Sequence, residues 1–519
     1  MAMFSTDTTQ ILVLGIPCIV ALAAAVRLST RKRVQGHALP LPPGPRGLPF
    51  LGNALQLDVE HPWLTYSAWG KKYGKIISSR LLGIDMIVIN SEAIARELLD
   101  KRSINYSGRP FIPTNEIYGL DFNTVLLPYP GEAIKQHRQI FHDVLRAEAS
   151  ASYHEMFTKH TNELILNLVT ATGDLQSQTH AYAGSLIMAV IYGHSAHGHD
   201  DPFLAGAYEL GEIGKHITSP EKAAMFTAFP ILEKMPLWIF GGVYAKIERS
   251  RSLAQQLLSG LFNEVKAQMA NGTAKQSLVA DFLSQPHDET GEKMMKAVAL
   301  TGYTAGIDTV ASVMHMFMLA MVLHPEIQER ARAEINRVVK PDAMPCLADD
   351  RASLPYIDAI LWEVLRCYPF APLGVPHTTS NDDVYDGYFI PKGTIIMVNQ
   401  WALSRDEEVY PDPSRFDPNR HLTADGQLKE PFTTHFAFGH GRRICPGRYF
   451  GDHGIWTAAT AILAVLRINH AKDSNGNQIE IKPEFTTGLG VHPLPFQCSF
   501  EIVNSTREQQ LRNSVNFSH

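Results

Sequence analysis

Phe438-Gly439-His440-Gly441-Arg442-Arg443-Ile444-Cys445-Pro446-Gly447 is the most informative stretch of this chain. It places one cysteine in a short loop between glycines, with arginines before it and an apolar segment after it. A deprotonated cysteine is a soft metal ligand. Glycines tolerate positive φ and carry no Cβ, so Gly441 and Gly447 are expected to let the backbone fold tightly around a flat ligand. Arg443 is then a candidate partner for an anionic group on that ligand.

The same residues resemble the haem-binding signature of the cytochrome P-450 family, FxxGxRxCxG, at every fixed position. In that family a cysteine thiolate is the axial ligand of the haem iron. The resemblance implies a haem b (iron protoporphyrin IX) ligated by Cys445. It also implies that Phe438, Gly441, Arg443 and Gly447 contact the cofactor.

Length and composition are those of a large globular domain. The chain has 519 residues, a net charge of −6 and five irregularly spaced cysteines. A chain of this length can bury a large core. The weak negative charge gives no reason to expect nucleic-acid binding. An odd number of cysteines without a Cys-x-x-Cys pair argues against a disulfide framework or a zinc ribbon, and it favours a reducing compartment.

Residues 1–38 are predicted to form an N-terminal membrane anchor with a basic flank, with the span at about residues 11–28. The segment 11–26 is apolar apart from Gly15 and Pro17, and basic residues follow from Arg27. A secretory signal would carry its positive charge before the apolar stretch, although a cleaved signal stays an alternative. The positive-inside rule keeps the rest of the chain cytosolic. Because the span is short, a thin internal membrane suits it, and we expect a single-pass protein of the endoplasmic reticulum membrane.

The remaining chain is predicted to comprise a proline-rich hinge at 39–53, a catalytic domain at 54–503 and a polar C-terminal tail at 504–519. Prolines fix φ and bias their predecessors away from helix, so the hinge should be stiff and extended. Helical spacing dominates from 91 to 366, and β-hairpins are predicted at 75–90 and at 384–399, the second turning near 391–393. The predicted fold is mainly α with a minor β portion, a single large cytochrome P-450-type domain behind an N-terminal transmembrane anchor.

The segment 297–323 is predicted to be one long apolar helix. A second membrane span is the alternative reading, but Asp308, His315 and several hydroxyl groups favour a helix in the core of a large domain. Ala305 and Gly306 leave room for a bulky ligand, and the next turn offers Asp308 and Thr309, whose side chains can order water and pass protons. A simple packing notch would explain the small residues as well.

Residues 305–309 resemble the oxygen-activation motif of the family, (A/G)GxDT. The resemblance implies that Ala305 and Gly306 lie against the haem. It assigns the catalytic role to Asp308 and Thr309.

Glu363 and Arg366 lie one helical turn apart. Such pairs are usually solvent-facing and weak. In the family, however, the ExxR pair is buried and a downstream arginine completes it, which the resemblance places at Arg415 in Pro413-Ser414-Arg415-Phe416. Burying a carboxylate between guanidiniums requires bidentate geometry. The structural triad Glu363, Arg366 and Arg415 is therefore expected to hold the loop that presents Cys445.

A haem carries two propionates, which need cations or hydrogen-bond donors. Alignment with the family motifs assigns Arg138 and His377 to them, beside Arg443; for Arg138 and His377 a plain surface base is the alternative. The family usually has a tryptophan four residues before the first of these arginines. Here that position is Ile134, so an indole donor is missing.

The resemblance implies a monooxygenase that inserts one oxygen atom of O2 into a small molecule. The chain has no flavin or nicotinamide fingerprint, so electrons are expected from NADPH through a separate cytochrome P-450 reductase, with cytochrome b5 as a further candidate donor. Apolar residues in the expected pocket favour a lipophilic substrate, such as a terpenoid or aromatic intermediate of fungal secondary metabolism. A reductase-independent haem-thiolate isomerase or dehydratase and a non-catalytic haem-binding protein are the alternatives, and Asp308 and Thr309 argue against both.

Overall fold

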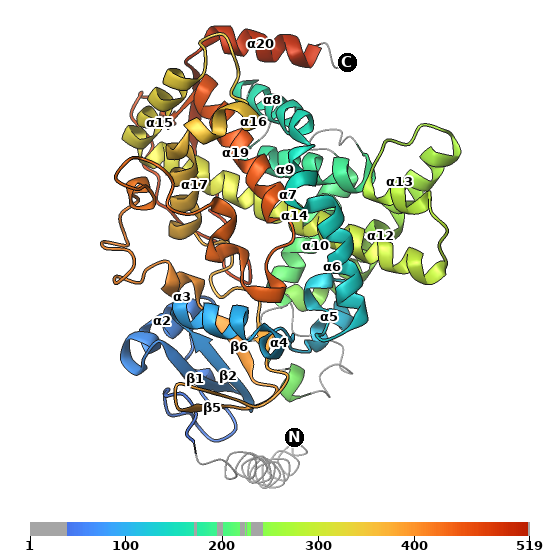
Figure 1. The fold of residues 1–519 in the computed structure, drawn as a ribbon, viewed down its shortest axis with the longest axis vertical. Coiled ribbons are helices and arrows are strands. Elements are labelled where there is room, and N and C mark those ends of the chain that lie inside the picture. The colour runs from blue at the N-terminus through green and yellow to red at the C-terminus, as the bar shows by residue number, and fades with distance from the viewer. Residues whose placement is uncertain are drawn as a thin grey trace, which may run out of the picture.

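A computed structural model describes residues 39–170, 174–194, 201–217, 224, 226–229 and 242–516. The predicted anchor at 1–38 lies outside the described residues. Within them the chain is mainly helical with a small β portion, which confirms that part of the predicted fold class. Helices make up most of the molecule, and the largest sheet lies at the end nearest to residue 39 (Figure 1).

The bounds of the elements are as follows. The longer helices are α2 (Pro62–Tyr73), α6 (Glu132–Leu145), α8 (His154–Thr170), α9 (Leu175–Tyr192), α10 (Pro202–Ile217), α12 (Ile247–Ala270), α14 (Glu289–Leu323), α15 (Pro325–Val338), α17 (Pro355–Cys367), α19 (Arg448–Val465) and α20 (Ser505–Asn516). Short helical segments include α3 (Glu92–Ala95), η2 (Arg96–Lys101), α4 (Ser103–Tyr106), α5 (Pro113–Tyr118), η3 (Thr124–Leu126), α7 (Ala147–Ala151), α13 (Leu278–Leu283), α16 (Leu347–Asp350), α18 (Gln400–Leu403), η9 (Pro418–His421), η11 (Phe436–Phe438) and η12 (Gly441–Arg443).

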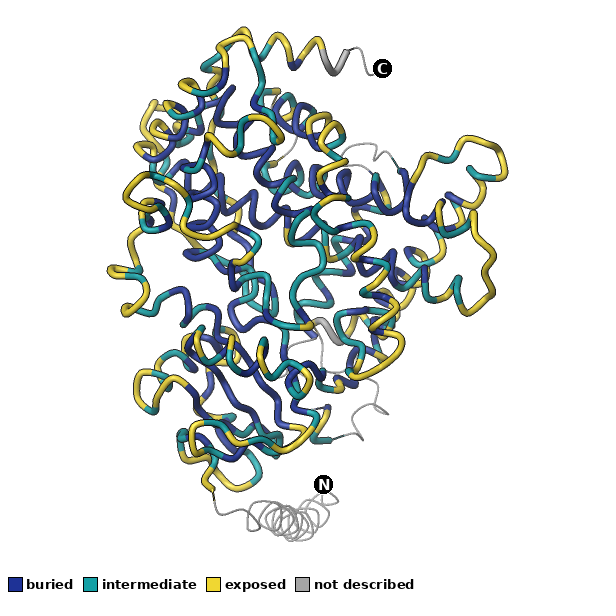
Figure 2. Tube along the Cα trace, in the orientation of Figure 1, coloured by how far each residue is buried: buried dark blue, intermediate teal, exposed yellow. Residues whose placement is uncertain are grey.

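Helix α14 is the central helix of the core. Its first turn is capped by the Asp288 side chain, which accepts a hydrogen bond from the amide of Gly291, and it ends at His324 before Pro325. It packs along α9 and α19, and it is buried for most of its length (Figure 2). Among the described helices it alone is long and apolar enough to cross a membrane, yet 78% of its most apolar window is buried inside the protein. The prediction of a core helix is confirmed.

The larger sheet has the strand order β1-β2-β6-β3, in which β3 is His377–Thr378. β1 (Ile76–Leu81) and β2 (Ile84–Ile89) form the first predicted hairpin. The second predicted hairpin is wrong in its turn and pairing. β4 (Asp383–Tyr385) pairs with β5 (Tyr388–Ile390) through Asp386 and Gly387, which both have positive φ, whereas β6 (Ile395–Val398) leaves after residues 391–393 and joins β2 in parallel. An Asp-Gly pair is the stronger turn signal because both positions tolerate positive φ.

The C-terminal segment predicted as a polar tail contains helix α20, which is anchored to the domain. Arg507 is fully buried, and its guanidinium donates to the carbonyl oxygens of Ala343 and Ala464 at 2.8 and 3.1 Å. Ala464 lies in the last turn of α19, where carbonyl oxygens have no partner within the helix, and Ala343 lies in the turn that follows α15. The α20 segment therefore packs as part of the helical domain.

Candidate active site

The cysteine loop connects η11 to α19. The amide of Cys445 donates to the carbonyl oxygen of Phe438 at 2.7 Å, which closes the loop on itself. Gly441 has a φ of 56°, and a Cβ at this position would lie 2.0 Å from the carbonyl oxygen of Leu99. Its glycine is thus needed for the close approach of η2. Gly447, the residue before α19, has a φ of −88°, so of these two glycines only Gly441 uses a positive φ.

The thiol of Cys445 is not ionised by its surroundings alone. Burial raises the pKa of Cys445 above that of an ordinary cysteine, although a hydrogen bond from the Gly447 amide and the charges of Arg138 and Arg448 act in the opposite direction. A bound metal ion would supply the missing stabilisation, because coordination deprotonates a thiol outright.

Guanidinium groups gather beside this loop. Arg138 of α6 donates to the carbonyl oxygen of Ile444 at 3.0 Å, and Arg443 donates to those of Ser107 and Leu127 at 2.9 and 2.6 Å. Burial and, to a smaller extent, the charge of Arg138 together lower the pKa of Arg443 to about 10. The structure thus places Arg138 and Arg443 close enough to repel each other.

Arg109 is a third member of this cluster, which the sequence did not indicate. It donates to the carbonyl oxygens of Val125, Val375 and Pro376 at 2.7 to 3.0 Å. Burial, together with the charges of Arg443 and Arg138, lowers its pKa well below the usual value. Within the described part of the chain, none of these three guanidiniums forms an ion pair with a carboxylate. Buried charges are ordinarily paired, so the cluster is suited to an anionic ligand.

Two further positions belong to the expected propionate site, His377 and Ile134. His377 is buried, and its Nδ1 lies 2.7 Å from the carbonyl oxygen of Tyr106, so Nδ1 carries the proton in the neutral ring. Burial and the charge of Arg109 lower the pKa of His377 well below its usual value. Its Nε2 would donate only if a nearby anion restored the imidazolium form. Ile134 is buried on α6 and offers no donor.

A cavity of about 220 Å³ lies along α14. Ala305 and Thr309 line it and are exposed, although α14 is otherwise mostly buried. The hydroxyl of Thr309 donates to the carbonyl oxygen of Ala305 at 2.8 Å. Gly306 does not line the cavity and faces α9 instead. A Cβ at Gly306 would be 2.9 Å from Cγ1 of Ile187, so this glycine lets α9 pack against α14. The expectation that Gly306 makes room for a bulky ligand is therefore corrected, and of the two small residues Ala305 lines the cavity.

Asp308 also lines the cavity, and its two oxygens face different bases. Oδ2 lies 3.7 Å from Nζ of Lys215 on α10, and Oδ1 lies 3.8 Å from Nε2 of His180 on α9. A Cβ at position 211 would lie 2.7 Å from Oδ2, so Gly211 leaves the space that the carboxylate fills. The sequence indicated Asp308 but neither of its basic neighbours, which come from distant segments.

Glu363 and Arg366 form a fully buried bidentate ion pair. Nε and the second terminal nitrogen of Arg366 donate to the two Glu363 oxygens at 2.6 and 2.7 Å. Arg366 also donates to the main-chain oxygens of Ser404, Pro413 and Arg415. The pair thereby connects α17 to the segment 404–415.

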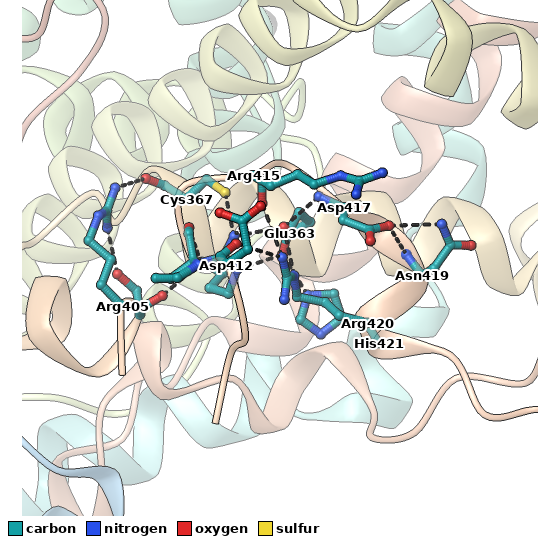
Figure 3. Close-up of polar contacts among 12 residues, drawn as sticks. Glu363, Cys367, Arg405, Asp412, Arg415, Asp417, Asn419, Arg420 and His421 are labelled. Atoms are coloured by element: carbon teal, nitrogen blue, oxygen red, sulfur yellow. Dashed lines mark hydrogen bonds and ion pairs between the residues drawn. The ribbon is translucent and has the colours of Figure 1, made fainter. Parts of the chain in front are cut away.

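The third arginine of the triad is corrected by the structure. The side chain of Arg415 is exposed and its guanidinium lies apart from Glu363, because only its carbonyl oxygen faces the cluster (Figure 3). Arg420 takes that place, with Nε 3.1 Å from Oε1 of Glu363, and His421 Nε2 lies 2.8 Å from Oε2. The short helix η9 turns both side chains back toward the carboxylate. A second Pro-x-Arg, at Pro418-Asn419-Arg420, was the available signal.

The protonation states in this cluster follow from its geometry. Burial would raise the pKa of Glu363, but the hydrogen bonds from Arg366 and His421 outweigh it and hold that pKa at about 2. Burial lowers the pKa of His421 despite its hydrogen bond to Glu363. The carboxylate is therefore charged at all ordinary pH values and is neutralised chiefly by the arginines.

The residues present fit a haem. Three features lie close together: a single loop cysteine, one buried and two half-buried guanidiniums without carboxylate partners, and a cavity that exposes Ala305 and Thr309. Arg109 contacts the cavity residues Val125 and Val375 on one side, and Arg138 contacts the cysteine loop on the other. A haem matches each of these features: its iron atom suits the cysteine, its two propionates suit the guanidiniums, and its flat ring suits the space beside the cavity.

Comparison with known proteins agrees with this chemistry. The sequence model of the cytochrome P-450 family matches residues 42–500. Cytochrome P-450 monooxygenase COX1 of Coprinopsis cinerea is 34% identical over 96% of this chain and 98% of its own. Cytochrome P-450 monooxygenase 105 of Postia placenta is 36% identical over 89% and 88%. Cytochrome P-450 monooxygenase claR of Ampulloclitocybe clavipes is 34% identical over 91% and 88%.

These findings define the class first: the protein is an oxidoreductase with a haem-thiolate type of site. The chain belongs to the cytochrome P-450 family, as its cysteine loop predicted, and it is a cytochrome P-450 monooxygenase.

Proposed function

We propose that this protein is a membrane-anchored monooxygenase of the endoplasmic reticulum that inserts one oxygen atom of O2 into a lipophilic small molecule. The observation that carries the proposal is the linked arrangement of the Cys445 loop, the unpaired guanidiniums and the cavity bearing Asp308 and Thr309. In the proposed organisation, residues 1–38 are the anchor, 39–53 the hinge, 54–503 the catalytic domain and 504–519 the C-terminal segment. The cytosolic domain would receive NADPH-derived electrons from a separate reductase, with cytochrome b5 as a second donor.

Each part of the site has a proposed role. Cys445 would ligate the haem iron, while Arg109, Arg138, Arg443 and His377 would hold the propionates. Phe438, Gly441 and Gly447 shape the loop around the cofactor, and Ala305 gives it room on the α14 side. When bound, the haem supplies reductive cleavage of dioxygen, which a thiolate ligand favours. The chain itself orients the substrate, excludes water and delivers protons through Asp308 and Thr309.

The substrate class follows from the cavity walls. Most of the lining side chains are apolar, including Leu120, Phe122, Val125, Leu210, Val375 and Leu489. Such a lining favours a lipophilic ligand with few polar groups. A terpenoid or aromatic compound of fungal secondary metabolism is the substrate we propose, because such molecules are largely apolar and match this lining.

The first experiment is the carbon monoxide difference spectrum of the reduced full-length protein. We expect the red-shifted Soret band of a thiolate-ligated haem, its loss in C445A and its retention in the control C498A, because Cys498 lies on β8 (Cys498–Ile502), away from the loop. Absence of the band in the wild type, or its survival in C445A, would overturn the proposal.

The second experiment separates the alternative functions. The protein is reconstituted with reductase in phospholipid vesicles and supplied with a panel of terpenoids and aromatic compounds, and products are identified by mass spectrometry. NADPH-dependent incorporation of one atom from labelled O2 supports the proposal. Product formation without NADPH would indicate an isomerase or dehydratase instead.

A further inference from the structure

The carboxylate of Asp308 has one oxygen whose partner is incomplete. Oδ1 is buried and accepts no hydrogen bond within the described part of the chain, although Nε2 of His180 lies only 3.8 Å away. A buried carboxylate oxygen without a donor is costly. Whether Oδ1 faces a donor therefore depends on which ring nitrogens of His180 carry a proton.

A contact with the main chain determines the protonation of one of the two ring nitrogens of His180. Nδ1 of His180 lies 2.8 Å from the carbonyl oxygen of Gln176, which can only accept, so Nδ1 carries a proton. In this neutral tautomer the lone pair of Nε2 faces Oδ1 of Asp308 at a distance of 3.8 Å, which is too long for a hydrogen bond. A proton added at Nε2 would place a donor beside this oxygen, and the hydrogen bond would form once the two groups approach each other. The geometry thus offers a path for a proton between His180 and Asp308.

His180 is partly exposed and does not line the cavity. Asp308 does line it, and the exposed fraction of the His180 side chain is 15%. The ring is held in place by Tyr208, whose ring lies edge-on at 4.7 Å between centroids, and by its bond to Gln176. The pair therefore connects a solvent-accessible imidazole to a cavity-lining carboxyl group.

The other charged and titratable groups around the pair leave this role to His180. Lys215 faces the opposite oxygen, Oδ2, and is itself paired with Glu212. Burial lowers the pKa of both His315 on α14 and His492 in the C-terminal loop to about 4, so both are neutral. Tyr208 is also close, and burial raises its pKa to about 12. Asp174, the capping residue of α9, and Glu212 are the remaining acids whose charge acts on this cluster.

We propose that His180 is a positioning residue for proton delivery, through which Asp308 is reprotonated from solvent. The inference rests on the proposed monooxygenase function, in which a substrate R–H, O2, two electrons from NADPH and two protons give R–OH and water. The imidazolium gives its Nε2 proton to Oδ1 of Asp308, and Nε2 then takes a proton from solvent at the exposed edge of the ring. The carboxyl group of Asp308 carries the proton to the cavity wall beside Thr309.

The first test needs no turnover. Infrared spectra of the full-length protein are recorded at a fixed pH, and the carboxyl bands of Asp308 are identified by their loss in D308N. Because Nε2 of His180 lies 3.8 Å from Oδ1, we expect these bands to shift in H180Q. H160Q is the matched control, since His160 pairs with Glu163 on α8 through Nδ1 at 2.8 Å and should leave the bands unchanged. Identical Asp308 bands in the wild type and in H180Q would overturn the inference.

A reciprocal measurement does not depend on H180Q folding. In spectra of ¹⁵N-histidine-labelled protein, D308N should shift the ring-nitrogen signals of one histidine, because Nε2 of His180 loses the carboxylate that faces it at 3.8 Å. If no histidine signal shifts in D308N, the inference is wrong.

With a substrate from the mass-spectrometric screen, H180Q should lower the rate of product formation about tenfold or more and increase the solvent isotope effect. The dissociation constant of that compound should stay unchanged, because His180 does not line the cavity. An unchanged rate and isotope effect would count against the inference. Failure of the monooxygenase assignment itself would be recognised separately, by the missing thiolate band.

Discussion

Replacing Arg420 with alanine should destabilise the protein strongly, and replacing Arg415 should not. Both arginines follow a Pro-x pattern within one short stretch, but only Arg420 reaches Glu363, whose side chain is fully buried. R420A and R415A are therefore a matched pair: each removes one guanidinium from the same segment.

The expected difference follows from the contacts that are lost. R420A removes the Nε bond to Glu363 at 3.1 Å and weaker bonds to the main-chain oxygens of Pro411, Asp412 and Arg415. A hydrogen bond to a charged group contributes about 1.5–3 kcal/mol. Removing one partner of a buried ion pair costs about 3–5 kcal/mol when nothing else remains. Because Arg366 and His421 still contact Glu363, we expect a loss of about 2–3 kcal/mol in the free energy of unfolding.

R415A keeps the carbonyl oxygen that faces the cluster and removes only an exposed side chain, so its effect should lie within about 0.5 kcal/mol. The assay is thermal unfolding followed by circular dichroism, together with the temperature at which the reduced carbon monoxide complex loses its thiolate band. Equal destabilisation by both variants, or an R420A variant that is as stable as the wild type, would refute this account of the triad.

Three other perturbations test separate parts of the molecule. The pKa of Glu363 at about 2 lies below its value of 4.5 in the unfolded chain, so its stabilisation of about 3 kcal/mol should be present above pH 4.5 and lost as pH falls toward 2, measured by acid unfolding. G441A should abolish the thiolate band, since a Cβ would meet the Leu99 oxygen at 2.0 Å, whereas G451A in α19 meets no atom within 4 Å and should be neutral or stabilising; a normal band in G441A would contradict this. The hydrogen bond to Asp201 raises the pKa of His194, although burial opposes this effect. The stabilisation by protonated His194 is therefore complete below the unfolded pKa of 6.5 and is lost as pH rises through the folded pKa. H194Q should lower the melting temperature more at pH 6 than at pH 9, and the opposite order would refute this prediction.

Local patterns in the sequence predicted what depends on local geometry. The fixed spacing around Cys445 indicated the loop, and the apolar run after residue 297 indicated the central helix. Both features are contained within one segment, so no distant partner was needed to recognise them. The same holds for the hairpin of β1 and β2, which is joined by a tight turn.

Other features depended on partners far away in the chain. Gly306 resembled a ligand notch, but Ile187 of α9 fills the space beside it. Arg415 and Arg420 share the same short pattern, and only the turn of η9 decides which one meets Glu363. Arg109 carries no pattern at all, because its role comes from the approach of segments that end at Val125 and Val375.

The structure also explains how a buried carboxylate can support the cysteine loop without touching it. No side chain of the Glu363 cluster hydrogen-bonds to residues 438–447 within the described chain. The connection runs instead through packed, tilted rings: the ring centroid of His421 lies 5.2 Å from that of Trp362, which lies 4.4 Å from that of His435.

Burial lowers the pKa of His435 well below its usual value, so its Nδ1 stays an acceptor, and the amide of Ala437 donates to it at 2.9 Å. This bond fixes the first turn of η11, whose last residue, Phe438, receives the amide hydrogen bond of Cys445. Arg366 and Arg420 hold Glu363 in place, and Glu363 in turn holds His421 and the packed rings of Trp362 and His435 in place. We infer that the Glu363 cluster controls the loop by orienting His435, which is why its loss should affect thiolate ligation as well as stability.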